Sequence, residues 1–135
     1  MSKQINIEAQ QKFGEAVNTG NFDLFRDVVA PNAIDNDPAL GQGNGPEGYV
    51  AFFTKMRTAF PDFKVEVVHM VADDNNVAFA YTATGTHQGD FQGIPATGNP
   101  IKIRGMQISR FENGKMVERW GSSDELGILK QIGVK

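Results

Sequence analysis

From Ile101 to Ser122 the sequence runs IKIRGMQISRFENGKMVERWGS, two candidate strands around an Asn113-Gly114 pair. Asn-Gly is the strongest short-range signal for a two-residue hairpin turn, because both positions of that turn need a positive φ angle. We therefore predict antiparallel strands over residues 101–111 and 115–122. A lone acid, Asp124, follows the second strand. The end of a strand is a place where the reactive residues of a small pocket are expected.

Two further strands are expected before this hairpin. From Phe63 apolar and charged residues alternate with the period of two that is typical of strands. After a turn at residues 73–76, segment 77–87 carries large side chains on one face and Ala and Thr on the other, and this small-residue face leaves room for a pocket. Gly85 and Gly105 lie inside strands and suggest bulges or bends. Segment 87–100 is rich in Gly and Pro, which fits either a pocket lid or a rigid connection.

Helices are expected in the first half and at the end of the chain. Apolar residues fall at helical spacing in segments 5–19, 24–29 and 46–60, with Pro31 and Pro61 ending the second and third of these. Asn21 is a candidate cap for the second helix, residues 33–35 are a candidate short strand, and a short helix is expected over residues 125–131. Segregated helices and antiparallel strands predict an α+β fold, in which a curved sheet encloses a pocket against the helices.

Composition limits the classes of function. The length of 135 residues predicts one domain covering residues 1–135, with an ordinary buried core. The net charge of −3 and the lack of a basic stripe argue against nucleic acid and anionic membranes as partners. The chain has no Cys and two widely spaced His, which argues against a zinc site. Without an apolar leader or a membrane-length apolar run, the expected location is the cytoplasm.

The chain resembles the SnoaL-like polyketide cyclase family, also called predicted ester cyclases, of the nuclear-transport-factor-2-like superfamily. The resemblance covers nearly everything from Phe13 onward. It rests on an ordered set of short motifs: Ala59-Phe60-Pro61-Asp62-Phe63, Val71-Ala72-Asp73, Gly85-Thr86-His87 with Gly89 and Phe91, Gly93-Ile94-Pro95 with Thr97-Gly98, Arg110-Phe111 with Gly114-Lys115, Trp120, Asp124, Leu126-Gly127 and Gln131-Ile132-Gly133.

This resemblance implies a cone-shaped α+β barrel with an apolar pocket, and a homodimer or higher homo-oligomer formed through the sheet. It also implies ring closure by intramolecular aldol condensation without metal or cofactor, with an Asp near the last strand as acid/base; Asp124 is the best match. Two positions depart from the family. Asn36 and Arg119 stand where many members carry His, so a His-assisted mechanism does not carry over directly.

Asp124 and His87 are the candidate catalytic residues. In an apolar pocket, a carboxylate can remove a proton from a carbon flanked by carbonyls. The alternative for Asp124 is that it caps the final helix, since Ser123-Asp124-Glu125 is a typical helix start. His87 is expected to orient or protonate a substrate oxygen, or else to bond nearby backbone as a loop residue.

Several residues are candidate contacts for a small apolar or aromatic ligand. A period of two places Trp120 on the same strand face as Asp124, as a pocket wall or as plain core. Arg104 is expected either to stabilise an enolate or to form surface ion pairs, and the same two possibilities hold for Arg110 and Arg119. Asp35 and Asn36 follow the first short strand and are expected to add polar contacts. The remaining candidates are Phe53, Met56 and Tyr81.

Three functions are consistent with the sequence. The first is a cofactor-independent cyclase or isomerase that acts on an apolar or polyketide-like carbonyl compound through Asp acid/base catalysis. The second is a small-molecule binding module without catalysis, suggested by the His positions occupied by Asn36 and Arg119. The third is a hydrolase, such as an epoxide hydrolase, in which an Asp activates water. A purely structural oligomerisation domain would instead show no accessible cavity.

Overall fold

The computed structural model describes residues 2–39 and 41–134. Helices and strands follow one another in the order α1 (Lys3–Thr19), α2 (Asp23–Val28), β1 (Val29–Asp35), α3 (Gly45–Ala59), β2 (Lys64–Ala72), β3 (Asn76–Thr86), β4 (Pro100–Glu112), β5 (Lys115–Ser123) and α4 (Glu125–Gln131). The α+β class is confirmed, with helices concentrated in the first half of the chain and the long strands in the second.

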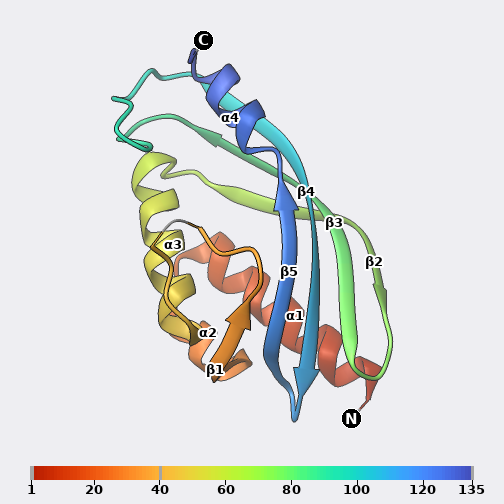
Figure 1. Ribbon diagram of the computed structural model, residues 1–135. Coiled ribbons are helices and arrows are strands. Elements are labelled where there is room, and N and C mark those ends of the chain that lie inside the picture. The colour runs from red at the N-terminus through yellow and green to blue at the C-terminus, as the bar shows by residue number, and fades with distance from the viewer. Residues whose placement is uncertain (1, 40, 135) are drawn as a thin grey trace.

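The five strands form one curved sheet in the order β1-β5-β4-β3-β2. All neighbours are antiparallel except β1 and β5, which run parallel. Among the described residues β1 does not pair with β2, so the sheet stays open and does not close into a barrel. Helices α1, α2 and α3 lie on one side of the sheet, and α4 lies at the end where β5 finishes (Figure 1).

The hairpin turn at Asn113-Gly114 is confirmed. Both residues adopt positive φ angles, 53° and 75°, and the adjacent pair Glu112 and Lys115 closes the turn. The β4–β5 register shifts once, between Arg110 and Phe111. This irregularity matters for the site, because the register beyond it decides which residues of β5 point towards the helices.

Strand β1 begins earlier than the sequence indicated. Val29 and Pro31 belong to this strand and not to the end of α2, which finishes at Val28. Proline lacks a backbone N–H, and an edge strand leaves one side of its backbone unpaired, so Pro31 is tolerated there. The predicted capping role of Asn21 is also wrong, since the N-cap position of α2 is Phe22 and no side chain caps it.

Strand β3 has the expected two faces, but the pocket lies on the other one. Phe79, Tyr81 and Ala83 face the helices and line a cavity, whereas the Ala and Thr face points to the outside of the sheet. The expectation that this small-residue face leaves room for a pocket is therefore wrong. The room is found between large aromatic side chains and the helices that cross over them.

Neither strand glycine marks a shift in register. The irregularities fall between Val29 and Ile34, between Val67 and His69 and between Arg110 and Phe111, away from Gly85 and Gly105. A Cβ on Gly85 would lie 3.0 Å from the side chain of Phe60, so this glycine permits a close approach of α3's end to the sheet.

No helix within residues 2–39 and 41–134 is both long and apolar enough to cross a membrane.

Candidate functional site

A cavity of about 600 Å³ lies between the helices and the inner face of the sheet. Its walls come from α1, α3, α4 and the strands β2 to β5, and Phe91 of the β3–β4 loop adds a buried ring. Most of the lining is apolar and aromatic, including Phe13, Phe52, Phe53, Met56, Phe63, Met70, Phe79, Tyr81, Ile103 and Ile128. This lining suits a small apolar or aromatic molecule.

A smaller space of about 210 Å³ adjoins the main cavity and is more polar. The two spaces share Gln107, Arg119, Ser123 and Glu125 in their linings, together with several aromatic rings of α1 and α3. Asp35 and Tyr49 line only the smaller space. Polar groups therefore gather at one end of an otherwise apolar cavity.

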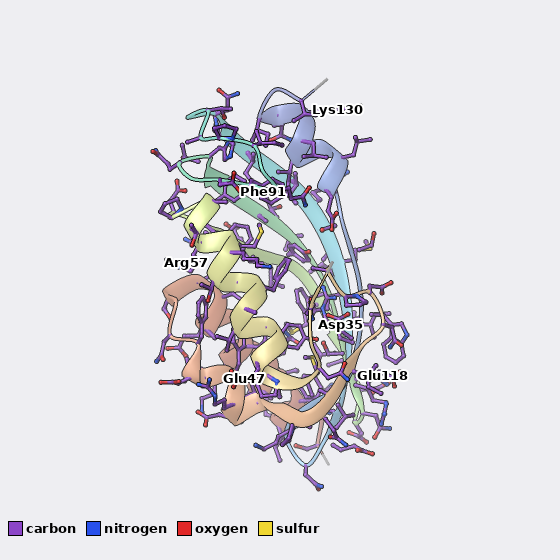
Figure 2. The ribbon with its side chains drawn as sticks, turned by 60° about the vertical axis from the view of Figure 1, so that its left-hand side comes forward. Asp35, Glu47, Arg57, Phe91, Glu118 and Lys130 are labelled. Atoms are coloured by element: carbon purple, nitrogen blue, oxygen red, sulfur yellow. The ribbon has the colours of Figure 1, made fainter. Side chains whose placement is uncertain are left out.

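An ion pair between Asp35 and Arg119 forms the centre of this polar end. Asp35 ends β1, and the parallel β1–β5 register places it opposite Arg119. Nη1 of Arg119 lies 3.0 Å from Oδ1 and 3.1 Å from Oδ2 of Asp35, and the side chains are only 17% and 6% exposed. Figure 2 shows Asp35 close to the strands, on the side of the sheet that α3 covers.

The Asp35 carboxylate accepts three more hydrogen bonds. Oδ2 accepts from the Tyr49 hydroxyl at 3.2 Å and from Nε2 of Gln42 at 3.1 Å, and Oδ1 accepts from the backbone N–H of Asp37 at 2.9 Å. Because both oxygens are already engaged, Asp35 is better suited to orienting its donors than to receiving a proton from a ligand.

The guanidinium of Arg119 is held on a second side by Gln107. Nε of Arg119 donates to Oε1 of Gln107 at 2.8 Å, and Nε2 of Gln107 donates to the Ser109 hydroxyl at 3.0 Å. A Cβ on Gly121 would lie 2.4 Å from Nη2 of Arg119, so only glycine lets the guanidinium lie against β5 here. The cation is thus fixed in place while it lines both spaces.

Two tyrosines keep their protons in this environment. Burial, and then the negative charge of Asp35, raise the pKa of Tyr49 above its ordinary value. Burial is also the main cause that raises the pKa of Tyr81, against a smaller opposing effect of the Arg119 charge. Both hydroxyls are therefore hydrogen-bond donors over the physiological pH range.

The predicted ligand contacts Phe53, Met56 and Tyr81 all line the main cavity. Met56 is buried, and Phe53 lies in an aromatic cluster with its ring centre 5.7 Å from that of Phe25. Tyr81 faces Gly105 across the β3–β4 pair, and a Cβ there would lie 2.3 Å from the Tyr81 hydroxyl. Gly105 therefore makes space for a tyrosine of the cavity wall.

Asp124 does not line either space. It is the N-cap residue of α4, with Oδ1 accepting a hydrogen bond from the backbone N–H of Gly127 at 2.8 Å. The residue is exposed. The structure thus shows the capping role that the sequence left open, and the neighbouring Glu125 lines the cavity instead.

His87 is fully buried but does not line the cavity. Its Nδ1 lies 2.9 Å from the Thr97 hydroxyl and accepts from the Thr97 backbone N–H at 3.3 Å, while Nε2 has no partner among the described residues. Backbone hydrogen bonds also join His87 to Asn99 and Gly98. His87 therefore anchors the base of the β3–β4 loop, as the loop alternative predicted.

Three expected ligand contacts lie away from the cavity. Trp120 pairs with Ile108 on the outer face of the sheet, so the predicted pocket wall is wrong. Arg104 lies on that same outer face of β4 and is exposed. Asn36 donates to Oε2 of Glu118 at 3.0 Å and to the backbone oxygen of Arg119 at 3.1 Å, which ties the end of β1 to β5.

Sequence reasoning missed Tyr49, Gln107 and Glu125. The sequence could have identified Tyr49, because a tyrosine within a wide apolar helix face needs a hydrogen-bond partner for its hydroxyl once it is buried. No sequence feature placed Gln107 and Glu125 at the site, because their position in the cavity lining depends on which way β4 and α4 face. In the described part of the chain, no three or more His, Cys, Asp or Glu side chains gather in the manner of metal ligands.

Comparison with known proteins identifies relatives of this fold and site. Residues 7–132 match the SnoaL-like polyketide cyclase family. The aklanonic acid methyl ester cyclase DauD of Streptomyces sp. (strain C5) is 28% identical over 140 residues, covering 98% of this chain and 83% of the relative.

Two solved structures are similar over almost the whole chain. IdmH from Streptomyces antibioticus superposes with a TM-score of 0.84 at 30% identity, covering 96% of this chain and 99% of that one. TsrD from Streptomyces laurentii gives a TM-score of 0.90 at 21% identity, covering 100% and 99%. The TsrD likeness shows the shared fold alone.

Proposed function

Because the chain belongs to the SnoaL-like polyketide cyclase family, we propose that it closes a ring in a small carbonyl compound bound in the main cavity. The observation that carries this proposal is an apolar cavity of about 600 Å³ with a fixed cation, Arg119, at its polar end. The similarity to DauD, a cyclase of aklanonic acid methyl ester, supports the same reaction class.

The polar end fits an intramolecular aldol reaction. A base removes a proton from a carbon next to a carbonyl, the resulting carbanion attacks a second carbonyl carbon, and the new alkoxide takes up a proton. Negative charge develops on oxygen in both stages. Arg119 lines both spaces, and Asp35 and Gln107 fix its orientation. A donor fixed in this way stabilises the oxyanion without reorganising during the reaction.

We assign the proton acceptor to Glu125 in place of Asp124. The Asp124 carboxylate accepts the hydrogen bond that caps α4, whereas Glu125 lines both spaces and its side chain has no hydrogen-bond partner among the described residues. A free carboxylate at the junction of the two spaces can reach a ligand that spans them. No cofactor is required for this chemistry.

Turnover of aklanonic acid methyl ester, followed by chromatography and mass spectrometry, tests the proposal. We expect a cyclised product of unchanged mass, at least tenfold slower formation with Glu125→Gln, and a wild-type rate with Asp124→Asn. The two variants are matched, because each replaces one carboxylate by an amide at neighbouring positions. Equal rates for Glu125→Gln and the wild type would remove Glu125 from the mechanism.

A non-catalytic binding module is the second candidate, and the placement of Asp124 favours it. The acid that the resemblance implied as the base caps a helix, and Asp35, the buried acid of the polar end, is saturated with donors. This reading predicts saturable binding of aklanonic acid methyl ester with no product, even at enzyme concentrations equal to that of the ligand.

A second copy of the chain is the proposed partner for the outer face of the sheet. Met106, Ile108 and Trp120 are 67%, 47% and 38% exposed on adjacent strands, beside the small residues of β3. Burying such a patch favours association. Sedimentation velocity should show a dimer that Met106→Asp dissociates, while Leu126→Asp on α4, which is equally exposed, leaves it intact; a monomeric wild type would contradict the proposal.

A further inference from the structure

Gln10 of α1 is a buried polar side chain that the network around Arg119 does not use. The residue is only 4% exposed, and it lines the main cavity. Its Oε1 is buried without a hydrogen-bond partner, and the structure gives neither atom of its amide a partner within residues 2–39 and 41–134. Burying an amide without hydrogen-bond partners lowers the stability of the folded protein, so the presence of a glutamine at position 10 needs an explanation.

The other buried glutamine of the cavity provides a comparison. Gln107 is 6% exposed, but its Oε1 accepts from Arg119 and its Nε2 donates to Ser109. Gln107 is therefore satisfied by the protein itself, and Gln10 is not. Both side chains line the main cavity, Gln107 from β4 of the sheet and Gln10 from α1. Figure 1 shows α1 crossing one side of the sheet.

Open space lies beside Gln10 on the same helix. Gly14 follows Gln10 by four residues, so both lie on one face of α1. A Cβ built on Gly14 would meet nothing within 4 Å, and Gly14 also lines the cavity. Glycine inside a helix destabilises it by about 1 kcal/mol relative to alanine, so local stability does not explain its presence. The glycine instead leaves room next to the unpartnered amide.

We propose that Gln10 is a ligand contact whose amide binds a hydroxyl group of the molecule held in the cavity, with the gap at Gly14 admitting that part of the ligand. A hydroxyl is the group that fits, since it can either donate to the amide oxygen or accept from the amide nitrogen, whichever of the two atoms faces the cavity. The inference rests on the proposed function, because it concerns the same cavity. It adds a second polar anchor on α1, so the preferred ligand has an apolar body with a carbonyl for Arg119 and a hydroxyl for Gln10.

Binding of two matched probes tests this inference. Acetonaphthone has an aromatic body and one carbonyl, and a hydroxyacetonaphthone with its hydroxyl on the ring remote from the acetyl group adds only the second polar group. Isothermal titration should show that Gln10→Leu weakens binding of the hydroxyl probe by about fivefold to tenfold, the size of one lost hydrogen bond. Acetonaphthone should bind Gln10→Leu as well as it binds the wild type.

The matched control is Gln4→Leu, the same change on the same helix at an exposed position outside the cavity lining. It should alter the affinity for neither probe. Thermal unfolding distinguishes a ligand-binding role of Gln10 from a structural one. Removing an unpartnered buried amide should not lower the Tm, so Gln10→Leu should unfold at or above the wild-type Tm. Equal effects of Gln10→Leu on both probes, or none on either, would overturn the role of Gln10.

A second variant tests the space independently. Gly14→Leu fills the gap while improving helix propensity, so the protein should fold and lose affinity for both probes by tenfold or more. Wild-type affinities in Gly14→Leu would show that ligand does not occupy this space and would overturn the inference. If neither probe binds the wild-type chain at all, the proposed function fails first, and the inference fails with it.

Discussion

The guanidinium of Arg119 meets both carboxylate oxygens of Asp35 from its Nη1, at 3.0 Å and 3.1 Å, and joins the edge strand β1 to β5 inside the protein. The parallel register that pairs the two residues is also what brings the polar end of the cavity together. A buried pair of this kind is expected to be costly to break, because the remaining partner keeps an uncompensated charge.

We predict that Arg119→Leu lowers the free energy of unfolding by about 3 kcal/mol. Asp35→Leu should have a similar effect, and the double variant should lose much less than the sum, since it leaves neither charge alone. Urea denaturation of the four proteins measures this cycle. Arg26→Leu is the control: its pairs with Asp23 and Glu47 are exposed, so it should cost at most about 1 kcal/mol. Additive losses would contradict the coupling.

The two tyrosines predict a loss of stability in alkali. The pKa values of Tyr49 and Tyr81 are raised in the folded protein, mainly by burial, whereas an unfolded tyrosine ionises near about pH 10. Below that pH both states are protonated and the shift has no effect on stability. Above it the unfolded state releases protons that the folded state keeps, so stability falls as the pH rises.

Two measurements check this prediction. Tyrosinate absorbance should stay low past pH 10 and then rise together with unfolding, since the protein has two tyrosines and both are affected. Urea denaturation between about pH 9 and 11 should show falling stability, with a smaller slope in Tyr49→Phe. A gradual tyrosinate titration centred near pH 10 in the folded protein would contradict it.

Gly105, which packs against the cavity residue Tyr81, and Gly14, which lines the cavity, should respond to alanine in opposite directions. In Gly105→Ala the new Cβ would lie 2.3 Å from the Tyr81 hydroxyl, so the ring must move and the protein should lose about 1–3 kcal/mol. In Gly14→Ala the new Cβ meets nothing and helix propensity improves, so stability should rise by about 0.5–1 kcal/mol. Thermal unfolding of both variants checks the pair, and destabilisation by Gly14→Ala would mean that the open space is not there.

Local sequence signals predicted most of the fold. The Asn113-Gly114 turn and the strands around it are encoded within a few residues, and the structure confirms them, with clear alternation of burial along β4. In β2 the alternation is interrupted by the register shift between Val67 and His69. Strand β1 was shortened in the prediction because Pro31 looked like a helix breaker, and only its place at the sheet edge permits proline. Edge position is a property of the whole sheet and is not visible in the segment.

The site was harder to predict, because it depends on register. Alternation alone placed Trp120 and Asp124 on one face of β5 but did not say which face points inward. The shift between Arg110 and Phe111 and the pairing of Trp120 with Ile108 put Arg119 inside and Trp120 outside. Asp35 and Arg119 were each noted as candidates, but their contact joins residues 84 positions apart through the parallel pairing of β1 with β5.

Substitutions at Asp124 distinguish a structural role of this residue from a catalytic one. As the N-cap of α4 it should tolerate Asp124→Asn, because asparagine caps helices as well as aspartate does, whereas Asp124→Ala should cost about 1 kcal/mol. Gly127→Ala should also destabilise α4, since its Cβ would lie 2.2 Å from Oδ2 and 2.9 Å from the capping Oδ1 of Asp124. Turnover should follow Glu125 and not Asp124. An Asp124→Asn protein of wild-type stability that had lost turnover would return Asp124 to the role of base, because asparagine replaces its hydrogen bond to Gly127 but not its ability to take up a proton.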